Sequence, residues 1–271
     1  MATFKIGLWV MWTRVNYCWR LSATGFSFFI FGLGGVFVPL VATFFISLSS
    51  SNDQVRQARA RKLVHWVFRA FVNMMSRLGI LTWDVQGLER LNGTEMLVLA
   101  NHPTLLDVVF LVAFIPNADC IVKSRLMRNP AMRGFVRMTG YITNDDGLHL
   151  MSKIERSLNN GNAIIIFPEG TRTKPHHRIS FQRGAARAVV HTKVKPTPVV
   201  ISCMPATLTK QHKWYHVPPH KFHLSFRVLD ALEIDRFMGQ HAALAARQLT
   251  RHMEDFFTKE VTTDEHRLTG T

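Results

Sequence analysis

The chain has 271 residues, which is enough for one catalytic-sized domain with an appendage of moderate size. Hydrophobic residues make up 47% of it and charged residues only 19%, and this balance excludes a disordered or tail-like protein. The formal charge of +15 predicts a negatively charged partner, either nucleic acid or an anionic membrane surface. The three cysteines form no C-x-x-C pair, so we expect no disulfide framework and no zinc site, and a reducing cytosolic environment.

The first 80 residues are predicted to anchor the chain in a membrane. No charged residue occurs from Leu21 to Asn52, a stretch long enough to cross about 30 Å of hydrocarbon. Gly32, Gly34, Gly35 and Pro39 interrupt this stretch near its middle, and basic residues flank both of its ends. Because basic residues prefer the cytoplasmic side, this pattern favours a helical hairpin that enters and returns over a single span.

The positive charge of residues 1–80 also indicates which negatively charged partner the protein binds. Residues 1–80 hold nine Lys or Arg against the single Asp53, and so contribute +8 of the total charge of +15. Positive charge beside an apolar segment is typical of proteins that bind anionic lipid. The sequence therefore favours a lipid partner over nucleic acid.

Residues 61–79 follow as an amphipathic helix. The apolar residues of one helical stripe are Leu63, Trp66, Val67, Ala70, Phe71, Met74 and Leu78. Such a stripe is typical of a helix that lies at a lipid interface, and equally of a helix that packs on a globular core. The hydrophobic pattern leaves both interpretations open.

Residues 81–271 are predicted to form an α/β domain with a mixed sheet flanked by helices, because short apolar runs alternate with amphipathic stretches. The predicted strands span residues 81–86, 96–100, 120–123, 163–167, 199–203 and 222–229. The predicted helices span residues 105–114, 130–138, 148–158, 181–192 and 234–260.

The first candidate site is the run Asn101-His102-Pro103-Thr104-Leu105-Leu106-Asp107, which joins a predicted strand to a predicted helix. The ends of strands in α/β sheets display reactive side chains. An imidazole takes a proton from a hydroxyl near neutral pH, and a carboxylate orients the ring and stabilises its cation. His102 and Asp107 are therefore a candidate general-base pair, although the spacing by itself also fits a surface pair or a helix cap.

The second candidate site is the run Phe167-Pro168-Glu169-Gly170-Thr171-Arg172, directly after the apolar strand predicted over residues 163–167. The Pro and Gly of this run end the strand and expose a turn. The planar guanidinium of Arg172 suits a phosphate, and the backbone N–H groups of Gly170 and Thr171 add donors. The same run also fits a β-turn in which Glu169 and Arg172 form a structural pair.

Together the two runs resemble the signatures N-H-x-x-x-x-D and F-P-E-G-T-R of the glycerolipid acyltransferase family, the 1-acyl-glycerol-3-phosphate acyltransferases and their relatives. The resemblance covers roughly residues 81–205. It extends to Lys123, Pro130, Gly134 and Gly140, to residues 181–185, and to Pro196 and Pro198.

One departure from the family pattern concerns the acceptor. The family's second block usually ends in an Arg that helps to hold the acceptor phosphate, but residues 140–146 read GYITNDD here. Asp145 and Asp146 at this place would repel a phosphate. The departure puts the identity of the acceptor in question more than the acyl-transfer chemistry.

The resemblance implies a glycerol-3-phosphate acyltransferase-like fold and direct acyl transfer from an acyl thioester to a lipid hydroxyl. His102 would act as the general base, Asp107 would orient it, and no covalent acyl-enzyme would form; the sequence has no G-x-S-x-G nucleophile elbow. No metal and no cofactor is expected, and acyl-CoA or acyl-carrier protein would be the co-substrate. The implied substrate-binding residues are Glu169, Gly170, Thr171 and Arg172, with Lys123, Arg125 and Arg183 as weaker candidates for a phosphate of acceptor or donor.

The function expected from these observations is synthesis of phosphatidic acid from 1-acyl-glycerol-3-phosphate, in phospholipid biosynthesis at the cytoplasmic face of a membrane, which is the inner membrane in a bacterium. A phosphate-free acceptor, such as an amino-acid-linked lysolipid or a hydroxylated acyl or polyene product, would not require the missing Arg. A non-catalytic membrane-binding scaffold would need neither candidate site. A nucleic-acid-binding protein would leave the apolar segment without a purpose, and no nucleic-acid-binding motif occurs.

Overall fold

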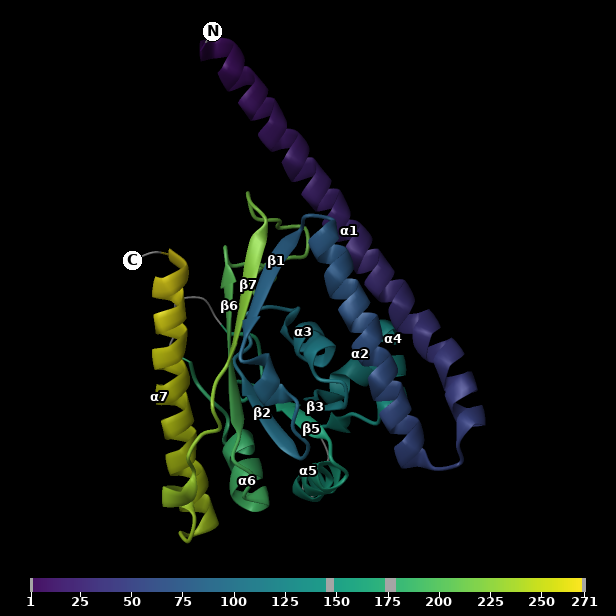
Figure 1. Cartoon of the computed structure of the whole chain (residues 1–271), viewed down its shortest axis with the longest axis vertical. Coiled ribbons are helices and arrows are strands. Elements are labelled where there is room, and N and C mark those ends of the chain that lie inside the picture. Colours follow the sequence, from purple (N-terminus) through teal and green to yellow (C-terminus); the bar gives the residue numbers. More distant parts are fainter. Residues whose placement is uncertain (1, 145–148, 174–178, 270–271) are drawn as a thin grey trace.

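A seven-stranded sheet with the strand order β1-β7-β6-β2-β5-β3-β4 forms the centre of the protein (Figure 1). This computed structural model describes residues 2–144, 149–173 and 179–269. Neighbouring strands run parallel except β6 and β7, so the predicted mixed sheet is confirmed. The strands are β1 (Leu81–Gln86), β2 (Met96–Ala100), β3 (Ala118–Val122), β4 (Ile142–Thr143), β5 (Ala163–Ile166), β6 (Thr197–Met204) and β7 (Phe222–Val228).

Helices cover both faces of the sheet. Successive side chains of a strand point to opposite faces, so Val98 and Ala100 of β2 join one core and Leu97 and Leu99 join the other. The first core includes α2 (Asp53–Arg77), α3 (Asp107–Phe114) and α4 (Pro130–Thr139), and the second includes α5 (Leu150–Asn159), α6 (Arg183–Thr192) and α7 (Ala242–Thr269). Burial on both faces explains why β2 and β5 are apolar throughout.

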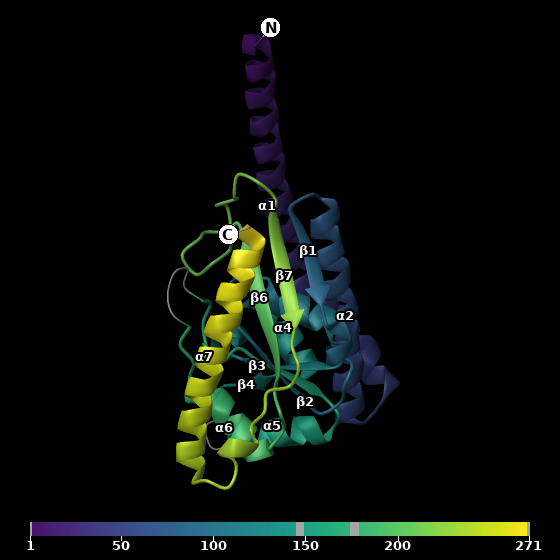
Figure 2. The ribbon, with the colours of Figure 1, turned by 60° about the vertical axis from the view of Figure 1, so that its left-hand side comes forward.

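The N-terminal apolar segment is one continuous helix, α1 (Ala2–Ser49), whose N-terminal end projects beyond the sheet (Figures 1 and 2). The hairpin predicted within residues 21–52 is therefore wrong. Gly35 serves close packing instead of a turn, because a Cβ on it would lie 2.1 Å from the carbonyl oxygen of Ala131 in α4. Gly134 of α4 approaches Pro39 in the same way, because a Cβ added to Gly134 would lie 2.7 Å from the Cβ of Pro39.

The chain reverses after α1 and continues as α2. Asn52 caps the new helix, since its side chain accepts the N–H groups of Gln54 and Val55. The predicted apolar stripe of this helix is only partly correct: Trp66 is 56% exposed, while the buried side carries Val64 and Phe68. Both N-terminal helices pack on the α/β domain, with α2 against α3 and α1 against α4.

Two further predictions need correction. The helix predicted over residues 234–260 is a short 3-10 helix (Asp235–Phe237) followed by α7, which begins only at Ala242. Gly239 lies between the two with φ +81°, a conformation that ends a helix. The two-residue strand β4 was not predicted, because so short a run has no periodicity to detect.

Candidate active site

The two candidate motifs meet at the carboxyl edge of the parallel strands. β2 and β5 are hydrogen-bonded neighbours in which Leu99 pairs with Ile166. His102 therefore emerges beside the turn that begins at Phe167. The strands β3 and β6 flank this pair, so the segments that follow them reach the same edge, where open α/β sheets bind their ligands.

His102 and Asp107 form a hydrogen-bonded pair. The imidazole Nδ1 lies 2.8 Å from Asp107 Oδ2, and the carboxylate is fully buried. The same carboxylate accepts the backbone N–H of Thr104 at 2.8 Å and its hydroxyl at 2.5 Å. Because a carboxylate only accepts hydrogen bonds, Nδ1 carries a proton, and in the neutral ring Nε2 then keeps its lone pair.

The second motif holds the backbone of the first. Glu169 Oε1 accepts the backbone N–H of His102 at 3.0 Å and the hydroxyl of Thr173 at 2.5 Å, and Thr173 N–H donates to the carbonyl of His102 at 2.7 Å. Burial raises the pKa of Glu169 above its ordinary value, and the hydrogen bonds from Thr173 and the His102 N–H partly counter this shift. The geometry thus gives Glu169 a positioning contact with His102, and the substrate contact expected for it stays a prediction.

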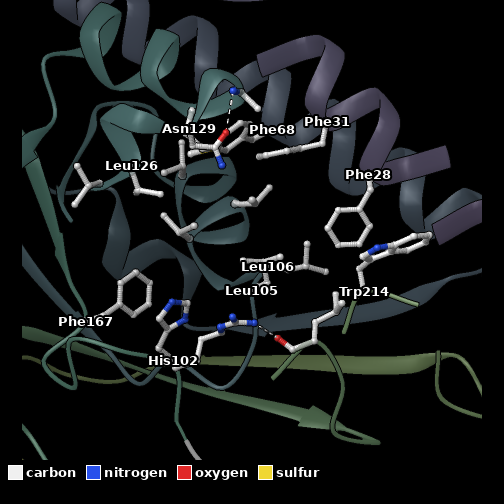
Figure 3. A pocket seen from close by; sticks show the side chains of 18 of the residues that line it. Phe28, Phe31, Phe68, His102, Leu105, Leu106, Leu126, Asn129, Phe167 and Trp214 are labelled. Carbon is white, nitrogen blue, oxygen red and sulfur yellow. Dashed lines mark hydrogen bonds between the residues drawn. The ribbon is translucent and has the colours of Figure 1, made fainter. Parts of the chain in front are cut away.

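A cavity of about 690 Å³ opens beside His102. Figure 3 shows the imidazole at one side of it with Phe167 alongside, and the two rings stack at 4.3 Å. The walls are largely apolar, with Phe28 and Phe31 from α1 and Phe68 from α2. The volume falls within the range of about 300–1,000 Å³ that is typical of ligand sites.

Cations line the polar part of this cavity. Arg172 Nη1 donates to the carbonyl oxygens of Leu208 at 2.8 Å and Thr209 at 2.9 Å, so the fork is partly occupied by protein. Burial lowers the pKa of Lys123, and the charges of Arg125 and Lys210 lower it further. The cationic lining residues are Lys123, Arg125, Arg172 and Lys210, and Gly170 and Thr171 line the cavity as well.

The structure does not bring every predicted residue to the site. Arg183 is exposed at the first position of α6 and is not among the lining residues that the structure describes. Asp145 and Asp146 lie outside the described residues. Sequence reasoning missed Thr104 and Thr173, whose hydroxyls support the pair, and Lys210, since neither a hydroxyl nor a lone lysine has a distinguishing spacing.

Comparisons with known proteins agree with this geometry. Residues 82–202 match the family model described as Acyltransferase. The chain is 29% identical over 150 residues to a 1-acyl-sn-glycerol-3-phosphate acyltransferase of Saccharomyces cerevisiae, covering 52% of this chain and 50% of that protein. It is 31% identical over 116 residues to the protein of the same name from Helicobacter pylori, covering 40% and 48%. The chain therefore spans about half the length of these relatives.

Among solved structures, the chain is similar to the 1-acyl-sn-glycerophosphate (LPA) acyltransferase PlsC from Thermotoga maritima. The TM-score is 0.61 at 19% identity, and the match covers 87% of this chain and 96% of the other. At this identity the likeness shows the fold, which agrees with the expected one. Residues 82–202 thus match the acyltransferase family model, and the chain is similar to 1-acyl-sn-glycerol-3-phosphate acyltransferases over this part of its length.

Proposed function

We propose that the protein transfers a fatty acyl group from an acyl thioester to the free hydroxyl of a lysophospholipid, with 1-acyl-glycerol-3-phosphate as acceptor and phosphatidic acid as product. The observation that carries the proposal is the His102–Asp107 pair at the edge of an apolar cavity that also holds cations. An acyl chain matches the apolar walls, and a phosphate matches Lys123, Arg125 and Arg172. With a phosphate-free acceptor, these cations would have only the phosphates of the donor to bind.

The pair supplies general-base catalysis. His102 Nε2 takes the proton of the acceptor hydroxyl while the hydroxyl oxygen attacks the thioester carbonyl, and Asp107 stabilises the resulting imidazolium through Nδ1–H. The tetrahedral intermediate then expels the thiol, which recovers the proton from His102. The ester bond forms as the thioester bond breaks, and His102 returns to its starting state.

The long helix α1 supports work at a membrane surface. Residues Met11–Ser49 are long and apolar enough to cross a membrane, and few of them are buried in the protein. The exposed apolar residues include Phe26, Phe29, Phe37, Leu40, Phe44, Phe45 and Leu48. Phe28 and Phe31 of the same helix line the cavity, so a lipid held at α1 lies close to the site. We assign the protein to the cytoplasmic face, where acyl-CoA and acyl-carrier protein are available.

Purified protein in detergent tests the proposal. Acyl-CoA and 1-acyl-glycerol-3-phosphate should give free thiol and phosphatidic acid in equal amounts, measured by a thiol reagent and by mass spectrometry. His102→Ala should abolish both signals, and a monoacylglycerol should be a poor acceptor. Equal use of the monoacylglycerol would favour a phosphate-free acceptor, and no transfer to any lysolipid would favour a non-catalytic scaffold.

A further inference from the structure

The segment that follows β6 places a cation in the cavity, and this cation belongs to neither sequence motif. Residues 205–221 connect β6 to β7, and Lys210 in this segment lines the same cavity as Lys123, Arg125 and Arg172. Each of these four residues follows the carboxyl end of a strand, with Lys123 and Arg125 after β3, Arg172 after β5 and Lys210 after β6. The sheet topology thus gathers cations from three places in the sequence.

The backbone that leads into Lys210 is fixed from both motifs. Arg172 donates to the carbonyls of Leu208 and Thr209, and the N–H of Leu105 donates to the carbonyl of Leu208 at 3.2 Å. Thr207, Leu208 and Thr209 are buried. The backbone before Lys210 is therefore anchored beside the reactive pair, and Lys210 itself is exposed.

The charge of Lys210 is not neutralised by any carboxylate in the described part of the chain. The two acidic residues nearest the reactive site already have partners, because Asp107 binds His102 and Thr104, and Glu169 binds the His102 N–H and Thr173. The positive charges instead repel one another, and this repulsion is one reason why the pKa of Lys123 is lowered. A cluster of cations that has no carboxylate partner among the described residues attracts an anion.

We propose that Lys210 binds the phosphate of the acceptor and so determines the preference for phosphorylated lysolipids. A phosphate monoester carries up to two negative charges, and the guanidinium of Arg172 is partly occupied by the carbonyls of Leu208 and Thr209. Lys210 adds a mobile point charge from a different strand end to those of Lys123 and Arg125. The proposal rests on the proposed function and names the residue that would give it acceptor specificity.

Steady-state kinetics of Lys210→Ala test this role against a matched control. Lys213 lies in the same segment, is exposed, does not line the cavity, and places its ammonium 5.6 Å from the ring of Tyr215. Loss of one charge-assisted hydrogen bond should raise the KM for 1-acyl-glycerol-3-phosphate by about 10- to 100-fold in Lys210→Ala and leave the KM for acyl-CoA unchanged. Lys210→Arg should retain most of the affinity, and Lys213→Ala should match the wild type.

The same kinetics distinguish the acceptor phosphate from the phosphates of the donor. A rise in the KM for acyl-CoA with an unchanged acceptor KM would assign Lys210 to the donor and overturn the proposal. Equal KM values in Lys210→Ala and the wild type would overturn it as well. Thermal melting of each variant checks that the exposed substitution leaves the fold intact.

A binding measurement separates this inference from the proposed function. Isothermal titration with sn-glycerol 3-phosphate, with glycerol as the uncharged control, needs no turnover. We expect Lys210→Ala to bind glycerol phosphate at least 10-fold more weakly than the wild type or Lys213→Ala. If the wild type binds it through Lys210 but does not acylate lysophosphatidic acid, the proposed function fails and the phosphate site stands. If the wild type acylates that lipid and Lys210→Ala binds glycerol phosphate normally, the proposed function stands and the phosphate-binding role of Lys210 fails.

Discussion

Replacing Asp107 by Asn removes one negative charge with almost no change of shape. Oδ2 accepts two N–H donors, from the His102 ring and from the Thr104 backbone, and the backbone N–H can only donate. The amide oxygen of the Asn must therefore occupy the Oδ2 position, and the amide nitrogen must face the Thr104 hydroxyl, which rotates to accept. His102 keeps its tautomer in this variant, so the substitution isolates the charge of Asp107.

The size of the effect follows from the burial of the pair. Asp107 is fully buried and the His102 side chain is 19% exposed, so an effective dielectric constant of about 20 is appropriate. Two unit charges about 4 Å apart then interact by about 4 kcal/mol. The amide dipole of the Asn restores part of the lost stabilisation of the imidazolium. About 1.4 kcal/mol corresponds to one factor of ten in rate. We expect kcat to fall by about 10² to 10³ in Asp107→Asn.

Initial rates of phosphatidic acid formation at saturating substrates provide the assay. Asp84→Asn is the matched control, because Asp84 Oδ1 lies 2.7 Å from His223 Nε2 in a second His–Asp pair whose residues do not line the cavity. Activity of Asp107→Asn above about a tenth of wild type would refute charge stabilisation of the imidazolium. A loss in Asp107→Asn much greater than about 10³ would refute the retained tautomer.

Four further outcomes follow from the structure. His102→Ala should lower kcat by about 10² to 10⁴, measured with the same assay; a loss smaller than 10-fold would contradict its role as base. Glu169→Ala removes one of the two acceptors of the partly buried His102 N–H and should lower both stability, by about 1 kcal/mol, and kcat; an unchanged melting temperature and rate would contradict the positioning contact. Gly35→Ala should destabilise the protein by about 1–3 kcal/mol by forcing α1 away from Ala131, whereas Gly34→Ala, with nothing within 4 Å, should not; equal melting temperatures would count against the close packing. High salt should leave the intact chain in the membrane fraction, since burial of apolar surface is not screened, and release by salt alone would show that α1 is not inserted.

The sequence by itself determined the features that depend on neighbouring residues. β1 and β2 have the predicted bounds, and β5 differs by one residue, because continuous apolar runs bounded by polar residues leave little freedom. The placement of His102 and of Arg172 at strand ends follows from the same local patterns. The mixed sheet flanked by helices was predictable for this reason.

Only the tertiary structure decided what depends on residues far apart in the chain. Gly35 interrupts an apolar run in the sequence, but the approach of α4 shows that it permits contact without bending α1. Glu169 stands in a run that the sequence assigns to substrate binding, yet it is buried and accepts the His102 N–H. Lys210 has no motif at all, and it reaches the cavity because β6 lies beside β2 and Arg172 anchors the backbone before it. The hydrophobic periodicity of a sequence shows which face of a helix or strand carries a side chain. The residues that this side chain contacts are fixed only when distant segments pack together.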